Sequence, residues 1–499
     1  MAKLQINTKV GGQPIAALPS NETSTDFVNR FKKGPVQATA TAAPTLLYEL
    51  TNPNINALNT ASDQFAANAE ANDRWLMVPA LNENTGGNLT GAVYIYDIES
   101  GALVKTYVGG DYSTSNSGII NAHLHGDFLF LAHNGEQTAS NDELQDFDIS
   151  TNSNGYVDMY DLTTGELIEH FVCPDSSTDF GSDLIVQGNI VYISSISQSK
   201  IYIYLINRVG KEDGWGSSYL GEYTHTATNS DFIVAGTLTA ISTTKIAYLS
   251  RKLTSPYAAY LNSFSPSSWV TFTAGGITPY NKVSLFDDFT IGGGGENFVQ
   301  SLPYFSLKAL HYTGENSLVQ DGYYLISDHT HDNVMLTYLN SNATTGTVYT
   351  NNFAAPPGYP TGAFGKSMST THLPMQTYEV NIYNHHTLVA IASSHYTTGA
   401  VHLWLKPGIN SNEDQVFKYT FTHPSYPYNF GRIVLATPTY LVVGTGGADS
   451  DDFNANGYRL LVYRHNIVAN TTAGAYSVEH LNSEKLRGKF NRLFKGRSK

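Results

Sequence analysis

Histidine gives this chain its clearest candidates for chemistry. His123 and His125 lie two residues apart with His133 close behind, and His329 and His331 repeat that spacing. On a β-strand, residues two apart point to one face, where two imidazoles are able to share a metal ion or act as acid and base. The chain holds 16 His in 499 residues, so ordinary strand and loop histidines are the competing interpretation, and the one we favour.

A second candidate is an oxygen-rich segment near the C-terminal end. Asp452, Asn454 and Asn456 alternate ahead of Gly457, as ligands do at the start of a calcium-binding loop. The position that normally holds a bidentate glutamate is Tyr463. We therefore favour a solvated hairpin loop here and keep a cation site as the alternative.

Other catalytic patterns are missing from the sequence. Gly292–Gly295 lacks the Gly-Lys-Ser/Thr of a phosphate-binding loop, and no Gly-x-Ser-x-Gly sequence occurs. The one cysteine, Cys173, has no histidine beside it in the sequence to activate its thiol, and it excludes an intramolecular disulfide. We expect no catalytic residue, no cofactor and no enzymatic activity.

These residues are expected to lie on β-strands, because one short sequence pattern recurs along the chain about every 61 residues. The pattern is typical of a strand: a run of β-branched and aromatic residues is followed by a polar turn. A strand–hairpin–strand unit precedes most copies. Its copies are Leu46–Leu50, Leu103–Val108, Leu167–Val172, Tyr219–Tyr223, Trp269–Phe272, Thr347–Tyr349, Val416–Phe421 and Tyr476–His480. This repetition predicts an all-β fold, a seven-bladed β-propeller over residues 45–480.

Two details of the propeller stay open at this stage. Either Leu46–Leu50 or Tyr476–His480 is able to supply the outer strand that closes the ring. Residues 276–302, with their glycine run, are expected to form an inserted loop rather than part of a blade.

Charge separates the two ends of the chain from the body. The net charge is -14, yet residues 1–44 and the last 19 residues are both basic, and the remainder carries 16 basic and 39 acidic residues. We divide the chain into an extended N-terminal arm at 1–44, the propeller at 45–480 and a basic C-terminal segment at 481–499. Basic arms on an acidic body favour docking on acidic partners.

Both arms also carry apolar residues. The C-terminal segment predicts a helix over 482–495 with one apolar face, interrupted only by Gly488. Alternatives are a tail without structure for the N-terminal arm, and packing on the propeller, a membrane surface or nucleic acid for the helix. The residues expected to dock on a partner are Phe27, Phe31, Lys32, Lys33, Leu486, Phe490, Leu493 and Phe494.

Several blade starts resemble the FG-GAP repeats of integrin-α-like propellers. The matching segments are Phe180–Val186, Phe430–Ala436 and, more weakly, Phe364-Gly365, each followed by similar strands. The resemblance implies a propeller and, in that family, calcium loops between the first two strands of a blade. Here those connections are only Gln187-Gly188 and Thr437–Thr439, which are too short for six or more oxygen ligands.

We expect a non-enzymatic structural or adhesion protein of a virion, assembled in the host cytoplasm. Tail nozzles of tailed phages include propeller domains, which is an analogy rather than a sequence match. The expected partners are neighbouring structural proteins or copies of itself, with a host-surface glycan as a further option; no apolar run is long enough to span a membrane, and the acidic body makes nucleic acid unlikely as a partner. The alternatives are a carbohydrate-binding propeller on a cell surface and a His/Tyr-dependent polysaccharide-active enzyme.

Overall fold

Every element in the described part of this computed structural model is a β-strand. The chain divides into a larger unit, Ala40–Met375 with Asn381–Ile467, and a smaller unit of Met1–Thr39, Gln376–Val380 and Val468–Lys499. The structure describes residues 9–10, 13–14, 37–40, 44–54, 65–66, 68–81, 83, 91–109, 118–134, 155–175, 177–187, 189–208, 215–224, 231–233, 238–242, 245–252, 258–266, 277–284, 307–309, 322–328, 333–339, 351–359, 364–373, 386–395, 398–406, 416–426, 429–446, 459–465 and 467–470.

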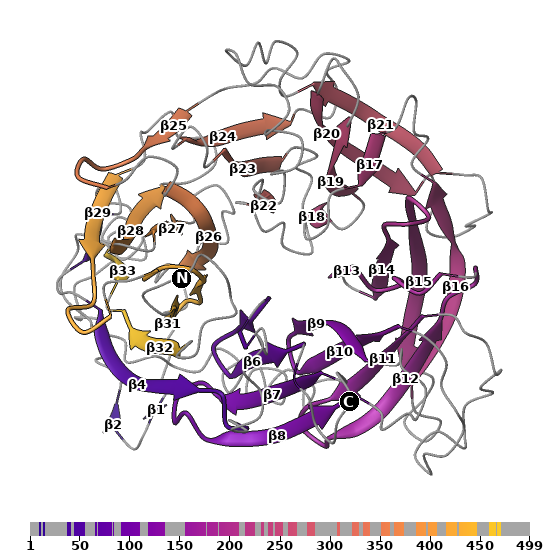
Figure 1. Ribbon diagram of the computed structural model, residues 1–499, viewed down its shortest axis with the longest axis horizontal. Helices are drawn as coiled ribbons and strands as arrows, with labels where there is room; N and C mark the ends of the chain where they lie inside the picture. The colour runs from indigo at the N-terminus through magenta and orange to yellow at the C-terminus, as the bar shows by residue number, and fades with distance from the viewer. Residues whose placement is uncertain are drawn as a thin grey trace, which may run out of the picture. The chain divides into compact units, whose positions relative to one another are not determined.

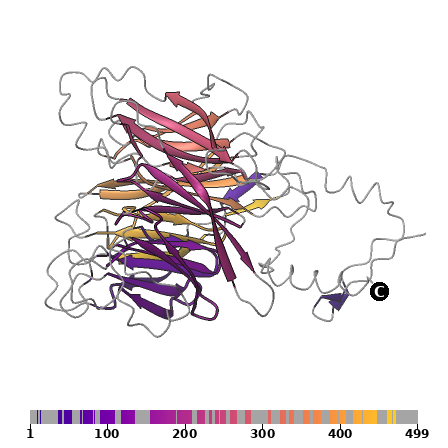
Figure 2. The same cartoon turned by 90° about the vertical axis from the view of Figure 1, so that its right-hand side faces the viewer.

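The larger unit consists of antiparallel sheets, most of them four-stranded, whose strands follow one another in the chain (Figures 1 and 2). The first sheet holds β5 (Glu70–Ala71), β6 (Trp75–Ala80), β7 (Ala92–Asp97) and β8 (Leu103–Val108). The second holds β9 (Ile119–His125), β10 (Phe128–His133), β11 (Tyr156–Asp161) and β12 (Glu166–Val172). The third holds β13 (Asp183–Gln187), β14 (Ile190–Ser195), β15 (Lys200–Arg208) and β16 (Trp215–Thr224).

The later sheets repeat this plan. The next holds β17 (Asp231–Ile233) and β18 (Thr239–Ser242), which both pair with β19 (Lys245–Lys252), then β20 (Ala258–Pro266) and β21 (Ile277–Ser284). It is followed by β22 (Leu307–Ala309), β23 (Gly322–Asp328), β24 (Asn333–Leu339) and β25 (Asn351–Ala354). After these come β26 (Phe364–Leu373), β27 (His386–His395), β28 (Thr398–Lys406) and β29 (Val416–Phe421).

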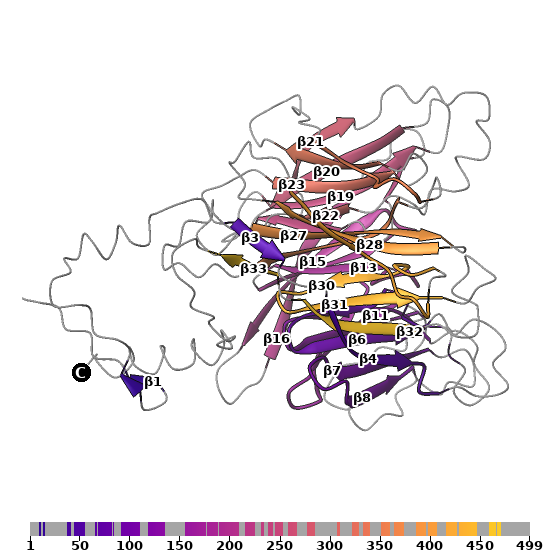
Figure 3. The same ribbon diagram turned by 90° about the vertical axis from the view of Figure 1, so that its left-hand side faces the viewer.

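One sheet is built from both ends of the larger unit. It holds β30 (Val434–Ala436), β31 (Tyr440–Thr445), β32 (Arg459–Arg464) and, as its last strand, β4 (Thr45–Thr51). β4 pairs antiparallel with β32, with Leu50 opposite Leu460 (Figure 3). Of the two strands that the sequence offered for closure, the early one therefore occupies the place. The other, Tyr476–His480, lies outside the described residues.

The fold of the larger unit is propeller-like. One strand of each sheet contacts one strand of the next in a series that returns to its start: β5 with β9, β9 with β13, β13 with β18, β18 with β22, β22 with β26, β26 with β30, and β30 with β5. In each sheet this is the first strand in the chain, except that β18 follows β17 and β30 follows β4. Such a series places each four-stranded sheet against two neighbours, as blades are placed in a propeller.

Alternation along single strands builds the core between the sheets. In β6, Leu76 and Val78 enter an apolar cluster shared with β31 and β32, whereas Trp75 and Met77 enter a cluster shared with β9 and β10. A middle strand is thus buried on both faces, which is why it reads as a continuous apolar run. Sheets β9–β12 and β13–β16 share a further cluster of the same kind.

The Phe-Gly pairs at the blade starts have a packing role. Phe180 is fully buried, with its ring 5.3 Å from that of Tyr202, and Gly181 has a φ of +92°. A Cβ on Gly181 would lie 2.4 Å from Cβ of Ala132 in the preceding sheet. Gly431 repeats this arrangement against Ala392. The resemblance to FG-GAP repeats therefore corresponds here to close packing of one sheet's start on the sheet before it.

The outer strands of several sheets share a β-bulge. In each, one residue has no partner on the neighbouring strand; these residues are Leu47, Val104, Ile168, Leu220 and Lys418. A bulge bends the strand and disrupts its free edge, which discourages pairing with a further strand.

One expectation from the sequence needs correction. Residues 276–302 were expected to form an inserted loop, but Ile277–Ser284 is the outer strand β21, paired with β20. The strand expected at Thr347–Tyr349 lies outside the described residues, and the last strand of that sheet in the described part is β25 at Asn351–Ala354. The expectation rested on the glycine run Gly292–Gly295, which lies after β21. β21 itself contains Pro279, a residue that edge strands accept.

The smaller unit contains β1 (Lys9–Val10), which pairs with β2 (Gln13–Pro14). In addition, β3 (Gln37–Ala40) pairs with β33 (Ile467–Asn470). The segment just before β4 therefore lies beside the segment just after β32. The helix expected over residues 482–495 lies outside the described residues.

We predict that Gly181→Ala destabilises the protein by about 3 kcal/mol, because the new methyl group requires both a strained backbone and displacement of Ala132. Gly126→Ala is the matched control, since Gly126 also has a positive φ (+60°) but no heavy atom within 4 Å of its Cβ position. Thermal unfolding measures both variants. Equal losses of stability would show that backbone strain alone, and not close packing, requires glycine at position 181.

Candidate functional site

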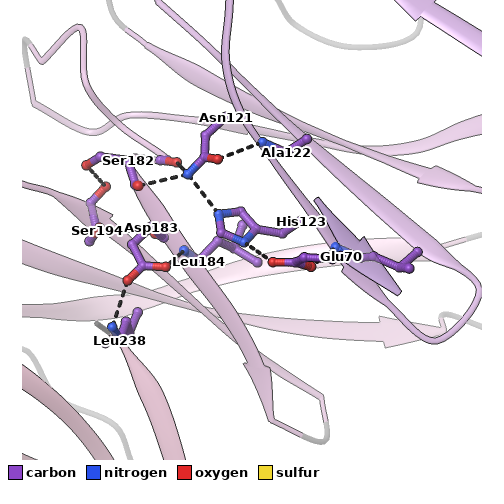
Figure 4. Close-up of polar contacts among 11 residues, drawn as sticks. Glu70, Asn121, Ala122, His123, Ser182, Asp183, Leu184, Ser194 and Leu238 are labelled. Atoms are coloured by element: carbon purple, nitrogen blue, oxygen red, sulfur yellow. Dashed lines mark hydrogen bonds and ion pairs between the residues drawn. The ribbon is translucent and has the colours of Figure 1, made fainter. Parts of the chain in front are cut away.

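Polar side chains on the first strands connect one sheet to the next (Figure 4). Glu70 of β5 accepts a hydrogen bond at Oε2 from the backbone N–H of Leu124 in β9, at 2.6 Å, and its Oε1 lies 3.2 Å from Nδ1 of His123. β9 is an edge strand that pairs only with β10 inside its own sheet. The carboxylate of Glu70 therefore gives a backbone donor of this edge a partner from the neighbouring sheet.

The same kind of contact continues from β9 toward β13. Asn121 donates from Nδ2 to the carbonyl oxygen of Ser182, at 2.8 Å, while its Oδ1 accepts from the N–H of Ala122. Asp183 of β13 then accepts from the N–H of Leu238, at 2.7 Å, immediately before β18. Three successive junctions between sheets thus carry a side-chain to backbone hydrogen bond.

Similar bonds occur in the last sheets. Ser367 and Ser369 of β26 accept from the N–H groups of Val434 and Ala436 in β30, at 3.0 and 2.9 Å. Asp73, in the turn after β5, accepts from the N–H of Thr439 at 3.0 Å and connects the sheet closed by β4 to the first sheet. We call this set the inter-sheet belt, and its members are Glu70, Asp73, Asn121, His123, Asp183, Ser367 and Ser369.

The belt determines what His123 is able to do. Nε2 of the ring lies 3.1 Å from Nδ2 of Asn121, an amide nitrogen that only donates. Nε2 is therefore the acceptor, and Nδ1 carries the proton that faces Glu70. Both ring nitrogens are engaged inside the scaffold, which leaves no lone pair for a metal ion or for proton abstraction from a substrate.

His123 and His125 both lie on β9. His123 is held in the belt, and His125 is at the end of the strand, where burial lowers its pKa and the nearby carboxylate of Glu70 acts in the opposite direction. In the described part of the chain, no group of three or more His, Cys, Asp or Glu side chains is placed to hold a metal ion.

Most other predicted site residues lie outside the described residues. They are the weak metal candidates His329, His331, Asp452, Asn454 and Asn456, and the docking residues Phe27, Phe31, Lys32, Lys33, Leu486, Phe490, Leu493 and Phe494.

Buried polar side chains form a cluster around His133, and the sequence did not reveal this cluster. Asp158 of β11 accepts from Nδ1 of His170 in β12 at 2.6 Å, and its second oxygen lies 3.7 Å from Nε2 of His133. The ring of His133 stacks on that of Tyr156 at 4.5 Å. Burial lowers the pKa of His133 to about 4, which outweighs the opposite effect of Asp158. Asp158 and His170 are 12 residues apart, so only the register of β11 and β12 unites them.

His402 is a second buried histidine. Its Nε2 lies 2.8 Å from Oγ of Ser393 and its Nδ1 lies 2.7 Å from Oγ1 of Thr420, among the rings of Tyr359 and Trp404. Burial lowers its pKa to about 4. At neutral pH the ring is therefore uncharged and acts as a hydrogen-bonded part of the core.

Comparison with known proteins gives little further guidance. No protein-family model matches the chain, and no match is found among curated proteins. Among solved structures it is similar to KlHsv2 with loop 6CD replaced by a Gly-Ser linker (9% identity, TM-score 0.33, 75% of this chain and 87% of that chain). It is also similar to a functionally unknown protein from Desulfotomaculum acetoxidans DSM 771 (8% identity, TM-score 0.33, 60% of this chain and 74% of that chain). Neither similarity is close enough to support an argument about function.

The described residues include no helix with the length and apolar character needed to cross a membrane.

We predict that Glu70→Ala lowers the free energy of unfolding by about 1–3 kcal/mol, because it leaves the N–H of Leu124 and the ring of His123 without this partner. The control is Glu99→Ala, since the Glu99 side chain is 73% exposed. Thermal unfolding compares the two. If both variants melted at the wild-type temperature, the belt would contribute nothing measurable to stability.

Acid is expected to destabilise the protein through its buried histidines. The pKa values of His133 and His402 are about 4 in the folded protein, below the ordinary value of about 6.5, so the unfolded chain binds more protons between these limits. The stability that these two neutral histidines contribute is fully present above pH 6.5. It is lost as the pH falls toward 4, and the free energy of unfolding then decreases by up to about 3 kcal/mol for each histidine.

Melting temperatures measured from pH 7.5 to 4.5 test this expectation. His402→Gln should give a shallower fall with acid than wild type, because the variant has lost one of the two buried histidines whose pKa is lowered to about 4. An identical acid dependence in the two proteins would contradict the role of His402.

Proposed function

We propose that this protein is a non-enzymatic structural or adhesion component of a virion. In this proposal a rigid seven-bladed propeller, with blades of the FG-GAP type, is docked into a larger assembly such as a phage tail, nozzle or capsid by its basic terminal arms. The partners are neighbouring structural proteins or further copies of the chain.

The series of sheet contacts supports the blade number. Each sheet in the series from β5–β8 to the sheet closed by β4 contributes one strand, which is β18 in the five-stranded sheet, and the last contact returns to β5. This circuit is consistent with the seven blades that we propose from the sequence.

The hydrogen bonds and the burial of three histidine rings support a structural protein rather than an enzyme. His123 and His402 have both ring nitrogens in hydrogen-bonding contacts within the protein, and His133 lies buried against Tyr156. A general base needs an imidazole that reaches substrate with a free lone pair. These three rings instead stabilise junctions and sheets.

The observation that carries the proposal is the pairing of β3 with β33. It places Gln37–Ala40, at the end of the N-terminal arm, beside Ile467–Asn470, which lies ahead of the C-terminal segment in the chain. Residues 1–44 carry five basic and two acidic residues, and residues 481–499 carry seven and one. Two basic segments of this kind suit attachment to an acidic partner.

We predict that deletion of residues 1–44 or 482–499 leaves the propeller folded but prevents assembly. Its sheets have their own clusters of buried residues, and their strands lie between Thr45 and Arg464, outside both deleted segments. Far-UV circular dichroism and thermal unfolding check the fold, and occupancy in purified particles checks assembly.

Point variants separate the two contributions of the arm. Phe490→Ala should weaken incorporation more than Lys489→Ala, because burial of an apolar anchor gives affinity while exposed charges chiefly accelerate encounter. Truncated chains that enter particles at wild-type occupancy would contradict the proposal and would favour a carbohydrate-binding adhesion protein instead.

A further inference from the structure

The strand that closes the series of sheets is connected differently from other outer strands. β8, β12 and β16 each follow the strand with which they pair, after residues 98–102, 162–165 and 209–214. β4 pairs with β32, and residues 52–458 lie between these two strands (Figure 1). A short turn keeps a detached strand close to its partner, and β4 has no such turn.

Few side chains of β4 are buried. Leu50 is buried and Tyr48 is partly buried, while the other five residues of the strand are exposed. β31, a middle strand of the same sheet, is buried at all six of its positions. Ahead of β4, β3 pairs only with β33, and a two-stranded sheet is marginally stable by itself. Low burial at a sheet edge is the condition under which a segment opens before the rest of a fold.

Tyr48 joins β4 to a sheet in which the strand has no backbone partner. Its hydroxyl donates to the carbonyl oxygen of Ile98, in the turn after β7, at 2.5 Å. Burial raises the pKa of Tyr48, so the hydroxyl keeps the proton that it donates. The ring packs against the apolar cluster that β6, β7, β31 and β32 share. One side chain therefore connects the closing strand to the first sheet.

Gly101 provides the space for the ring of Tyr48. A Cβ on Gly101 would lie 2.9 Å from Cδ2 and Cε2 of that ring, and the φ of Gly101 is +72°. Gly165 has the same place in the corresponding turn of the next sheet, with a φ of +77°, and in both turns the glycine N–H donates to the carbonyl oxygen four residues earlier. A Cβ on Gly165 would instead meet Nζ of Lys105, the end of a flexible side chain, at 2.9 Å. The two turns thus share a backbone conformation and differ in what lies against the glycine.

The chain that follows β4 is fixed by a separate contact. Nδ2 of Asn54 donates to Oε1 of Glu83 at 2.6 Å, and Oε2 of Glu83 accepts from the hydroxyl of Tyr94 in β7 at 2.7 Å. Glu83 is fully buried. This contact does not involve β32, so β4 is able to leave β32 while Asn54 stays in place.

We propose that β4 is a closing strand that detaches from β32 while the sheets remain folded, and that Tyr48, in its place against Gly101, determines how often it detaches. Detachment breaks the ladder between β4 and β32 and the ion pair of Glu49 with Arg459, whose atoms lie 3.1 Å apart. It leaves β30, β31 and β32 as a three-stranded sheet. The larger unit thus has one junction at which its series of sheets opens without unfolding, a property that the docking function proposed above does not include.

Hydrogen exchange of the purified full-length chain, followed by mass spectrometry, tests the proposal. In wild type, the amides that β4 donates to β32 should exchange at least about 10-fold faster than those that β16 donates to β15. Gly101→Ala should accelerate the β4 amides by about a further 10-fold and leave those of β16 unchanged, because the new methyl group displaces the ring of Tyr48. Gly165→Ala is the matched control and should leave the β4 amides unchanged. Wild-type β4 amides as slow as those of β16 would overturn the proposal, as would equal acceleration of both strands by Gly101→Ala.

Tyr48→Phe tests the contact without straining the backbone. Loss of the hydroxyl should accelerate the β4 amides by about 2- to 10-fold. The control is Tyr204→Phe, which should not affect them, because Tyr204 donates to the carbonyl oxygen of Val172 between two other sheets, at 3.1 Å. If Tyr48→Phe exchanged like wild type in β4, the role given to Tyr48 would be wrong.

A crosslink tests detachment itself. Thr45 and Arg464 face each other across the ladder of β4 and β32, at a spacing that cross-strand disulfides accept. In the double variant Thr45→Cys/Arg464→Cys, the oxidised form should exchange its β4 amides at least about 10-fold more slowly than the reduced form, with β16 unchanged. The native Cys173 is buried. Equal rates in the oxidised and reduced forms would show that β4 exchanges without leaving β32 and would overturn the proposal.

Discussion

The larger unit depends on how the first strand of each sheet satisfies its free edge. Such a strand pairs on one side only, and its remaining backbone groups face the neighbouring sheets, where an unpaired donor is costly. The inter-sheet belt meets this need in β9, where Glu70 of the preceding sheet accepts from the N–H of Leu124. It also joins other sheets, through Asp183 to the N–H of Leu238 just before β18 and through Asp73 to the N–H of Thr439 between β30 and β31. One set of bonds thus serves the edges and fixes the junctions. It also engages both ring nitrogens of His123, which was among the clearest candidates for chemistry in the sequence.

The outer strands, at the opposite edge of each sheet, are protected in other ways. Bulges at positions such as Val104 and Ile168 disrupt the outer strands, and β12 adds carboxylates. β8 keeps the bulge but not the carboxylates, so it resists extension of its ladder while presenting apolar side chains.

The sequence predicts the larger features because they are local. The repeated strands, the Phe-Gly pairs and the all-β class follow from patterns within single repeats. β21 was missed because the glycine run Gly292–Gly295, which lies after it, predicted a loop for the whole segment, and its pairing with β20 comes only from the fold. The belt was missed for another reason: Glu70 and Leu124 are 54 residues apart, in different repeats, and no local pattern pairs them. Asp158 and His170 likewise meet only through strand register.

Closure by β4 has a consequence for synthesis of the chain on the ribosome. β4 ends at Thr51 and its partner β32 begins at Arg459, so roughly 400 residues, or some 20–80 s of translation, separate the two strands. The early sheets complete themselves while this segment, with Leu46, Leu47 and Leu50, waits without its partner. A nascent chain of this protein therefore carries an unpaired apolar strand until β32 has been made. During that time chaperones are able to bind the strand, and a strand from another nascent chain is able to pair with it in place of β32.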